Sequence, residues 1–464
     1  MKKVYISIAS LLLCGSMLMA QSPANRTSKT IVADVLAQMP AEQQAEYNKL
    51  INDLSSTGEE GVLMLINKIN APGKGSNSNV DYALSGLTHY VMAKGEENAR
   101  LATANAYLKA LDKVSDRETK AFIIRQLQLL GKDECVDTLA SYLNDESLSG
   151  PAARALSAIR TDNAKKVLVA SLMRRSGTPK TQKDIIRAIA DVQIADAENV
   201  LKVMLGSSDE NMQKEVLYAL SRVGSKASLG DLAAAAEKVG YKMEKTGANE
   251  AYIALIKRVL EQGDTKDAEK AANDLLKKST KAGMTQTREA ALQILLAAKP
   301  EAATKNLLSA LKDTDKGYRN AALNFASGFA DQNVYIEVMK HMLKAKPEVK
   351  VDILNWIGRE SKCPSKHDMI KNLELRFDLP ARQVLLDQLK DKDFYVQQAA
   401  VWALVKIGDK SVIPVLADLL KSNDKQVILL GQDALMAFNG DIDQAVAKAV
   451  SYTHLRAHET RHDL

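Results

Sequence analysis

The chain has 464 residues, 46% of them hydrophobic, and its 63 basic and 57 acidic residues leave a formal net charge of +6. This near balance, with aromatic residues at only 5%, argues against a nucleic-acid-binding protein that uses a basic stripe or a base-stacking platform. By itself the length suggests about three domains. This relation between length and domain number does not apply to a repeat protein, which grows by adding copies of one unit.

The N-terminus has the pattern of an export signal. Two lysines precede an apolar run over residues 4–19, which is short for a membrane span. We therefore expect residues 1–20 to be a signal peptide, and the protein to reach the periplasm or the extracellular space with no transmembrane segment after signal removal. Leu13 stands before Cys14, where a lipoprotein signal has a small residue, so simple secretion is favoured over lipid attachment.

Residues 21–79 are predicted to form an N-terminal helical, capping region with a loop at 71–79. Helix starts are expected where a hydroxyl residue stands three positions before a carboxylate, which is the capping-box pattern. Residues 57–60 and 115–118 fit this pattern, and residues 181–184 are expected to cap a helix in the same way.

A helix-turn-helix pattern recurs from residue 80 to 449, at a spacing of roughly 30–33 residues. In the cleanest copy, residues 391–420, the apolar side chains recur every three or four positions, and Gly408 separates two helices. A single helix pair cannot bury such an apolar stripe, so the copies must stack. The sequence predicts an all-α, right-handed α-solenoid (superhelix) from about residue 30 to 449, without a sheet.

Two segments break the regular pattern. Residues 231–279 carry helices that look longer than the repeat allows, which predicts either a longer helical pair or an insertion. Around residues 360–390, Pro364 and Pro380 are expected to stop helices, because the residue before a proline disfavours helical geometry. The last apolar helix pattern ends near Ala449.

The copy at 391–420 resembles the HEAT repeat family, and the copy at 143–172 resembles it more loosely. The residues that carry the resemblance are Asp391, Asp393, Val396, Ala399, Ala400, Ala403, Leu404, Ile407, Gly408, Ile413, Pro414, Leu416, Leu419 and Leu420. The resemblance implies an armadillo-like helical scaffold that offers a concave groove to a protein partner. It implies no chemistry.

The signal peptide followed by this array also resembles the front half of exported bacterial proteins in which HEAT repeats precede a 3-keto-disaccharide hydrolase-like domain. Residues 450–464 resemble a translated sequencing adapter and are interpreted as an artefactual tail. Together these resemblances imply a truncated protein, and any hydrolase activity is expected in a missing C-terminal domain after residue 449.

No residue qualifies as a catalytic, cofactor-binding or metal-ligating residue. His454, His458 and His462 are spaced like helical metal ligands but lie in the adapter-like tail. His367 and Asp368 are assigned to a surface loop, and His89 and His341 to structural positions within helices.

Glycines around Lys74 lack the spacing and the preceding strand of a phosphate loop. Cys135 and Cys363 stand many repeats apart and are expected to be buried, unpaired thiols.

Two functions remain open. The first is an exported HEAT-repeat scaffold that binds a protein or another partner, glycan-related partners included, through its groove. The second is the non-catalytic half of a truncated sugar hydrolase. A nucleic-acid partner and a cofactor are not expected.

Overall fold

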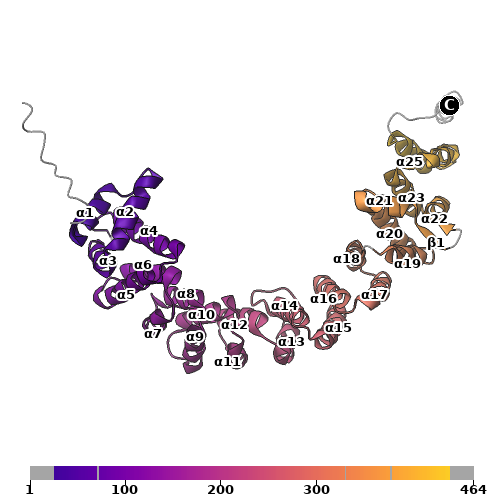
Figure 1. Cartoon of the computed structure of the whole chain (residues 1–464). Helices are drawn as coiled ribbons and strands as arrows, with labels where there is room; N and C mark the ends of the chain where they lie inside the picture. Colours follow the sequence, from indigo (N-terminus) through magenta and orange to yellow (C-terminus); the bar gives the residue numbers. More distant parts are fainter. Residues whose placement is uncertain (1–25, 71–72, 330, 377–378, 439–464) are drawn as a thin grey trace, which may run out of the picture. The chain divides into compact units, whose positions relative to one another are not determined.

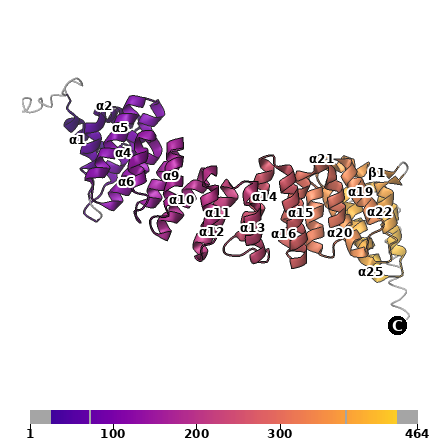
Figure 2. The ribbon, with the colours of Figure 1, turned by 90° about the horizontal axis from the view of Figure 1, so that it is seen from below.

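The computed structural model describes residues 26–70, 73–329, 331–376 and 379–438 (Figures 1 and 2). The chain divides into two compact units, unit 1 ending at Ser228 and unit 2 beginning at Leu229. The predicted signal peptide, the tail at 450–464 and its three histidines lie outside the described residues. The described part is an α-solenoid, a stack of helix pairs.

Unit 1 consists of α-helices joined by short turns. Its helices are α1 (Ser28–Gln38), α2 (Gln44–Ser56), α3 (Gly58–Ile66), α4 (Ser78–Lys94), α5 (Glu97–Lys113), α6 (Arg117–Leu130), α7 (Val136–Ser141), α8 (Ser149–Ile159), α9 (Asp162–Arg174), α10 (Pro179–Asp191), α11 (Glu198–Met204) and α12 (Glu210–Val223). Each even-numbered helix packs against the next even-numbered helix. The helices α2, α4, α6, α8, α10 and α12 therefore form a continuous row, which we call the A row of unit 1. The odd-numbered helices α3 to α11 lie on the other side and form the B row (Figure 1).

Unit 2 repeats this arrangement. Its helices are α13 (Leu229–Lys238), α14 (Ala248–Glu261), α15 (Thr265–Ala282), α16 (Thr285–Ala298), α17 (Ala303–Ala310), α18 (Lys316–Ala326), α19 (Gln332–Met342), α20 (Pro347–Glu360), α21 (Pro364–Lys371), α22 (Ala381–Gln388), α23 (Phe394–Ile407), α24 (Ile413–Asp418) and α25 (Lys425–Met436). The A row of unit 2 contains α14, α16, α18, α20, α23 and α25, and the B row contains α13, α15, α17, α19, α22 and α24 (Figure 1).

The predicted copy at 391–420 is present as α23, a turn and α24. The Asp393 carboxylate caps α23 by accepting hydrogen bonds from the backbone N–H groups of residues 395 and 396. Gly408 ends α23 with φ +72°, a left-handed conformation that glycine adopts without steric cost. All six apolar positions assigned to the inner face of this helix are buried: Val396, Ala399, Ala400, Ala403, Leu404 and Ile407.

Three of the expected helix starts are wrong in detail. Thr57 is the turn residue between α2 and α3 and has helical backbone angles, and its hydroxyl donates to the Leu54 carbonyl instead of capping. The cap of α6 is Asp116, one residue later than Ser115. The cap of α10 is Thr178, because Pro179 already occupies the first turn of that helix.

The segment 231–279 covers most of α13, all of α14 and most of α15, an 18-residue helix that is longer than the other B-row helices of unit 2. The expectation of a chain without a sheet is wrong locally, since β1 (Glu374–Arg376) pairs antiparallel with β2 (Leu379–Pro380). A helix ends before each of the two prolines, as expected: α20 ends at Glu360 and α21 at Lys371. Pro364 itself begins α21, and α22 follows directly after Pro380. A proline ring suits the first helical turn, where no N–H donor is needed.

Candidate functional site

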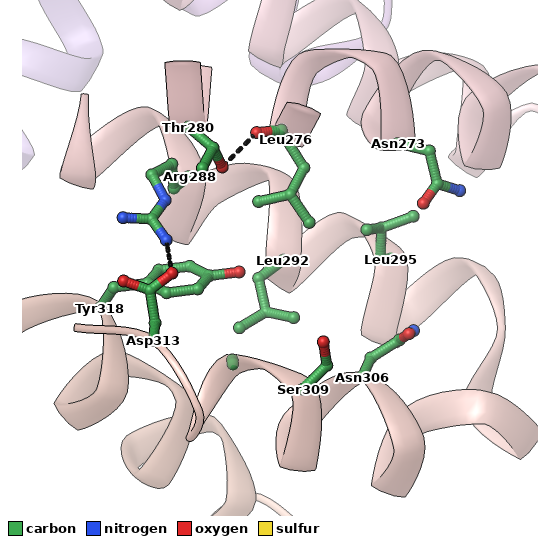
Figure 3. A pocket seen from close by; sticks show the side chains of 11 residues that line it. Asn273, Leu276, Thr280, Arg288, Leu292, Leu295, Asn306, Ser309, Asp313 and Tyr318 are labelled. Atoms are coloured by element: carbon green, nitrogen blue, oxygen red, sulfur yellow. Dashed lines mark hydrogen bonds and ion pairs between the residues drawn. The ribbon is translucent and has the colours of Figure 1, made fainter. Parts of the chain in front are cut away.

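Four helices of unit 2 surround a hollow of about 290 Å³, which lies between α15, α16, α17 and α18 (Figure 3). Its lining residues are Asn273, Leu276, Thr280, Arg288, Leu292, Leu295, Asn306, Ser309, Ala310, Asp313 and Tyr318. The leucines of α16 form an apolar floor, and the side chains of α15 and α17 supply amides and hydroxyls around it.

An ion pair holds one wall of this hollow. Arg288 is 5% exposed, its guanidinium binds the Asp313 carboxylate, and its Cζ lies 4.0 Å from the centre of the Tyr318 ring. Burial raises the pKa of Tyr318 to about 12, with Arg288 opposing the shift, so the phenol is neutral at ordinary pH. Figure 3 shows its hydroxyl pointing into the hollow.

This arrangement suits binding rather than acid–base chemistry. The Asp313 carboxylate is engaged by Arg288, and the neutral Tyr318 hydroxyl titrates far above the pH where a general acid or base is efficient. What remains are hydrogen-bonding groups over an apolar floor, which can hold a polar side chain or a small polar molecule.

A smaller hollow of about 170 Å³ lies in unit 1 between the loop before α4 and the first turns of α6. Asp81 and Arg125 both line it. Burial raises the pKa of Asp81, and the positive charge of Arg125 partly offsets this effect. The pair links α4 to α6 electrostatically.

The solvent-facing side of each A row follows one pattern. In each helix, one exposed or half-buried residue stands between buried residues, and we call it the central position. In α6, α8, α10 and α12 of unit 1 it is Arg125, Arg154, Arg187 and Tyr218. In α16, α18, α20 and α23 of unit 2 it is Gln293, Asn324, Asn355 and Trp402.

Three arginines in succession make the unit 1 face basic. We call Arg125, Arg154 and Arg187 the arginine row. For each of α6, α8, α10 and α12 we take the central position and the residues one turn before and after it. Of these twelve residues, six are Lys or Arg and only Asp191 is acidic. These twelve residues are Ala121, Arg125, Leu129, Gly150, Arg154, Ala158, Lys183, Arg187, Asp191, Lys214, Tyr218 and Arg222.

The corresponding face of unit 2 is rich in amides. Among the twelve equivalent residues of α16, α18, α20 and α23, with Gly328 just after α18, five are Asn or Gln and only Glu289 is acidic. These residues are Glu289, Gln293, Ala297, Asn320, Asn324, Gly328, Val351, Asn355, Arg359, Gln398, Trp402 and Lys406. Arg359 donates to the Asn324 side chain (2.8 Å). Burial, together with the nearby charges of Lys362 and Arg359, lowers the pKa of Lys406.

The residues singled out from the sequence do not converge on either face. His89 is exposed on α4 and His341 is half-buried on α19. The assignment of His367 and Asp368 to a loop is wrong, because both lie in α21, where the His367 Nδ1 is 2.9 Å from the carbonyl oxygen of Ser361. Within the described ranges, no group of three or more His, Cys, Asp or Glu side chains is arranged to hold a metal ion.

The sequence alone does not reveal the arginine row, because basic and acidic residues are mixed along the chain. Helices α6 and α10 carry both signs, and only the burial pattern separates their exposed central arginines from the neighbouring carboxylates. The usable signal was the recurrence of Arg at 125, 154 and 187 in the same place of the buried pattern, at the spacing of the repeat.

The comparisons with known proteins support the fold. Residues 359–436 match a family model described as HEAT repeats. A solved Kap121p mutant is similar at 12% identity and TM-score 0.50, over 93% of this chain and 49% of its own. The Kap95:Nup1 complex is similar at 12% identity and TM-score 0.46, over 95% of this chain and 64% of its own.

An engineered protein is similar at 20% identity with a TM-score of 0.25, over 88% of this chain and 99% of its own. No curated protein sequence matches the chain. The chain spans about half the length of Kap121p, and that likeness shows a stacked helical fold alone. The described helices include none that is long and apolar enough to cross a membrane.

Proposed function

We propose that the protein is an exported scaffold that binds a protein partner along the solvent-facing side of its A rows. The single observation that carries this proposal is the repetition of polar side chains at the central positions, Gln293, Asn324 and Asn355 in unit 2 above all. One polar side chain per helix, held on packed elements, gives a regularly spaced set of contacts for a long partner.

Supporting features come from the fold. HEAT-type solenoids commonly serve as protein-binding scaffolds, and the family match falls on the part of unit 2 that contains α23. The amides of this face both donate and accept hydrogen bonds, which suits contact with a polypeptide backbone. The half-buried Trp402 adds an aromatic contact of the kind enriched in protein interfaces.

Site-specific photo-crosslinking in the source cell tests this proposal. A photoreactive residue at Gln293 or at Asn355 should produce the same discrete adduct, because both positions face the same partner. The matched control is Lys305, which is exposed on the B-row helix α17 and should give no such adduct. Adducts at Lys305 but at neither A-row position would contradict the proposed face.

Export is tested separately. The mature protein should begin at Gln21 and appear in the periplasmic or extracellular fraction, as measured by mass spectrometry of the intact chain. A cytoplasmic protein that retains residues 1–20 would refute export and leave the binding face untouched.

A further inference from the structure

We infer that the arginine row of unit 1 binds an extended acidic segment of the partner, with a carboxylate at about every third residue. This inference rests on the proposed function, because it names the chemistry of the partner. It concerns Arg125, Arg154 and Arg187, which lie on the neighbouring A-row helices α6, α8 and α10.

The spacing of the helices sets the register. Helices packed side by side have axes about 8–10 Å apart, so successive central arginines are separated by about that distance. An extended chain advances about 3.3 Å per residue, so every third residue meets the next arginine. Each guanidinium can then bind one carboxylate in two-pronged fashion.

Arg187 is already held in position for such a contact. Its Nε donates to Glu215 of α12 at 2.9 Å, and a second bond to the same carboxylate makes the pair bidentate. The Arg187 side chain is nevertheless 58% exposed. Because a guanidinium carries five N–H donors, it retains donors for a second carboxylate.

The surrounding charges favour an anionic segment. Lys183, Lys214 and Arg222 flank the row on α10 and α12. The carboxylates that face the arginine row are largely shielded from solvent and paired with basic side chains. The Asp184 side chain is 16% exposed and pairs with Lys180, and the Glu215 side chain is 14% exposed and pairs with Arg187.

Further carboxylates set the limits of the surface. Asp191 is exposed at the end of α10, Asp81 faces Arg125 from α4, and Asp116 and Glu118 at the start of α6 line the same hollow as Arg125. Like charges repel, so an acidic segment is disfavoured across α4. The binding surface therefore begins at α6 and runs toward α12.

A polypeptide fits this surface better than single-stranded nucleic acid. Binding of successive bases relies on aromatic side chains that stack with them. Among the twelve residues of this face, Tyr218 is the one aromatic residue, and the Cζ of Arg222 lies 5.7 Å from its ring centre.

The test uses the full chain and two fluorescent peptides of about 15 residues, long enough to cross three A-row helices in extended form. In the spaced peptide Glu occupies every third position between Gly and Ser, and in the grouped peptide the same residues are rearranged with all Glu at one end. Fluorescence anisotropy measures Kd at low and at physiological ionic strength.

The decisive variant is the triple Arg125→Gln, Arg154→Gln, Arg187→Gln. It should weaken binding of the spaced peptide by about tenfold or more, since each substitution removes a charge-assisted contact. The double Arg125→Gln, Arg154→Gln leaves the Arg187–Glu215 pair intact and should weaken binding to an intermediate extent. Circular dichroism checks that each variant remains folded.

A matched control changes the same charge elsewhere in unit 1. The triple Lys113→Gln, Lys166→Gln, Arg174→Gln alters exposed residues of α5 and α9 and should leave the Kd within about twofold. Equal losses of affinity for the spaced peptide in the two triple variants would overturn the inference, as would equal affinities for the spaced and grouped peptides. Either result would show that general electrostatic attraction explains the binding.

A thymidine oligonucleotide of similar length tests the alternative that the arginine row binds single-stranded nucleic acid. Tighter binding of this strand than of the spaced peptide, lost in the arginine triple, would overturn the inference in favour of nucleic acid. If the peptide does not bind but the crosslinks from Gln293 and Asn355 still form, the inference fails and the scaffold proposal stands. Loss of those crosslinks is the separate failure of the proposed function.

Discussion

A buried ion pair of Arg319 and Asp352 joins two A-row helices of unit 2. Both side chains are 4% exposed, and Nη2 of Arg319 lies 2.7 Å from the Asp352 carboxylate. Nη1 of the same guanidinium donates to the carbonyls of residues 313 and 314 at 3.0 Å. The pair thereby fixes the turn before α18 to α20.

Asp352→Ala should lower the free energy of unfolding of unit 2 by about 3–5 kcal/mol, because it leaves the buried Arg319 without a counter-charge. Urea denaturation followed by tryptophan fluorescence reports on this unit specifically, since both tryptophans, Trp356 and Trp402, lie in it. The control Asp418→Ala removes an exposed pair with Lys421 and should cost less than about 0.5 kcal/mol. Equal costs for the two variants would contradict the role of burial.

Glu360 lies at the centre of a second buried network. It accepts hydrogen bonds from Tyr335 (3.0 Å) and Lys366 (2.7 Å), and Tyr335 stacks on Trp356 with ring centres 4.8 Å apart. Burial favours a higher pKa for Glu360, but hydrogen bonds from Lys366, Ser327 and Tyr335 outweigh it and lower the pKa below the ordinary value of 4.5.

Because the pKa is lowered in the folded state, the stabilisation by Glu360 is complete above about pH 4.5 and is lost as the pH falls through the folded-state pKa. Compared with Glu360→Gln, the native protein should be more stable at neutral pH, and this difference should shrink on acidification. Urea titrations of both proteins, monitored by tryptophan fluorescence, measure the difference. A stability difference between the two proteins that stays constant from neutral to acidic pH would refute the stabilising role of the Glu360 carboxylate.

At the scale of elements, Gly358 allows α20 and α23 to approach closely. A Cβ atom added there would lie 3.0 Å from the Ala403 Cα and 3.1 Å from the Lys406 Cδ. The backbone of α23 cannot yield as a flexible side chain does, so the two helices would have to separate. The same approach places the stem of Lys406 over α20.

Gly358→Ala should therefore destabilise unit 2 by about 1–3 kcal/mol, the usual cost of overpacking. Gly230→Ala is the matched control: nothing lies within 4 Å of the added Cβ, and α13 is helical there, so stability should stay equal or rise by up to about 1 kcal/mol. Denaturation midpoints from tryptophan fluorescence compare the two. A neutral Gly358→Ala would show that the helices adjust without cost.

At the scale of the whole molecule, the two cysteines of the described chain behave as separate free thiols. The expectation that both are buried is wrong for Cys363, which is partly exposed. Burial raises the pKa of Cys135 to about 12, whereas hydrogen bonding with Ser365 lowers that of Cys363. Cys135 lies in unit 1 and Cys363 in unit 2.

A maleimide reagent should therefore label Cys363 and spare Cys135 in the folded mature protein, as read by peptide mass spectrometry, because the thiolate is the reactive form. Adding a reductant should leave the denaturation midpoint unchanged. Rapid labelling of Cys135, or a midpoint lowered by reductant alone, would contradict this expectation.

The sequence alone determined the helical repeat, because burial of one helix face leaves a three-four periodicity that survives in any copy, as in α23. It determined helix starts less well, since Thr57, Asp116 and Thr178 show that several neighbouring polar residues compete for one cap.

Only the tertiary structure decided which side chains share a surface. Arg125, Arg154 and Arg187 are 29 and 33 positions apart, and stacking of α6, α8 and α10 is what brings them into one row. The hollow beside Arg288 likewise exists because four helices border it. Local periodicity specifies a helix, whereas a binding surface depends on contacts between helices that no single segment encodes.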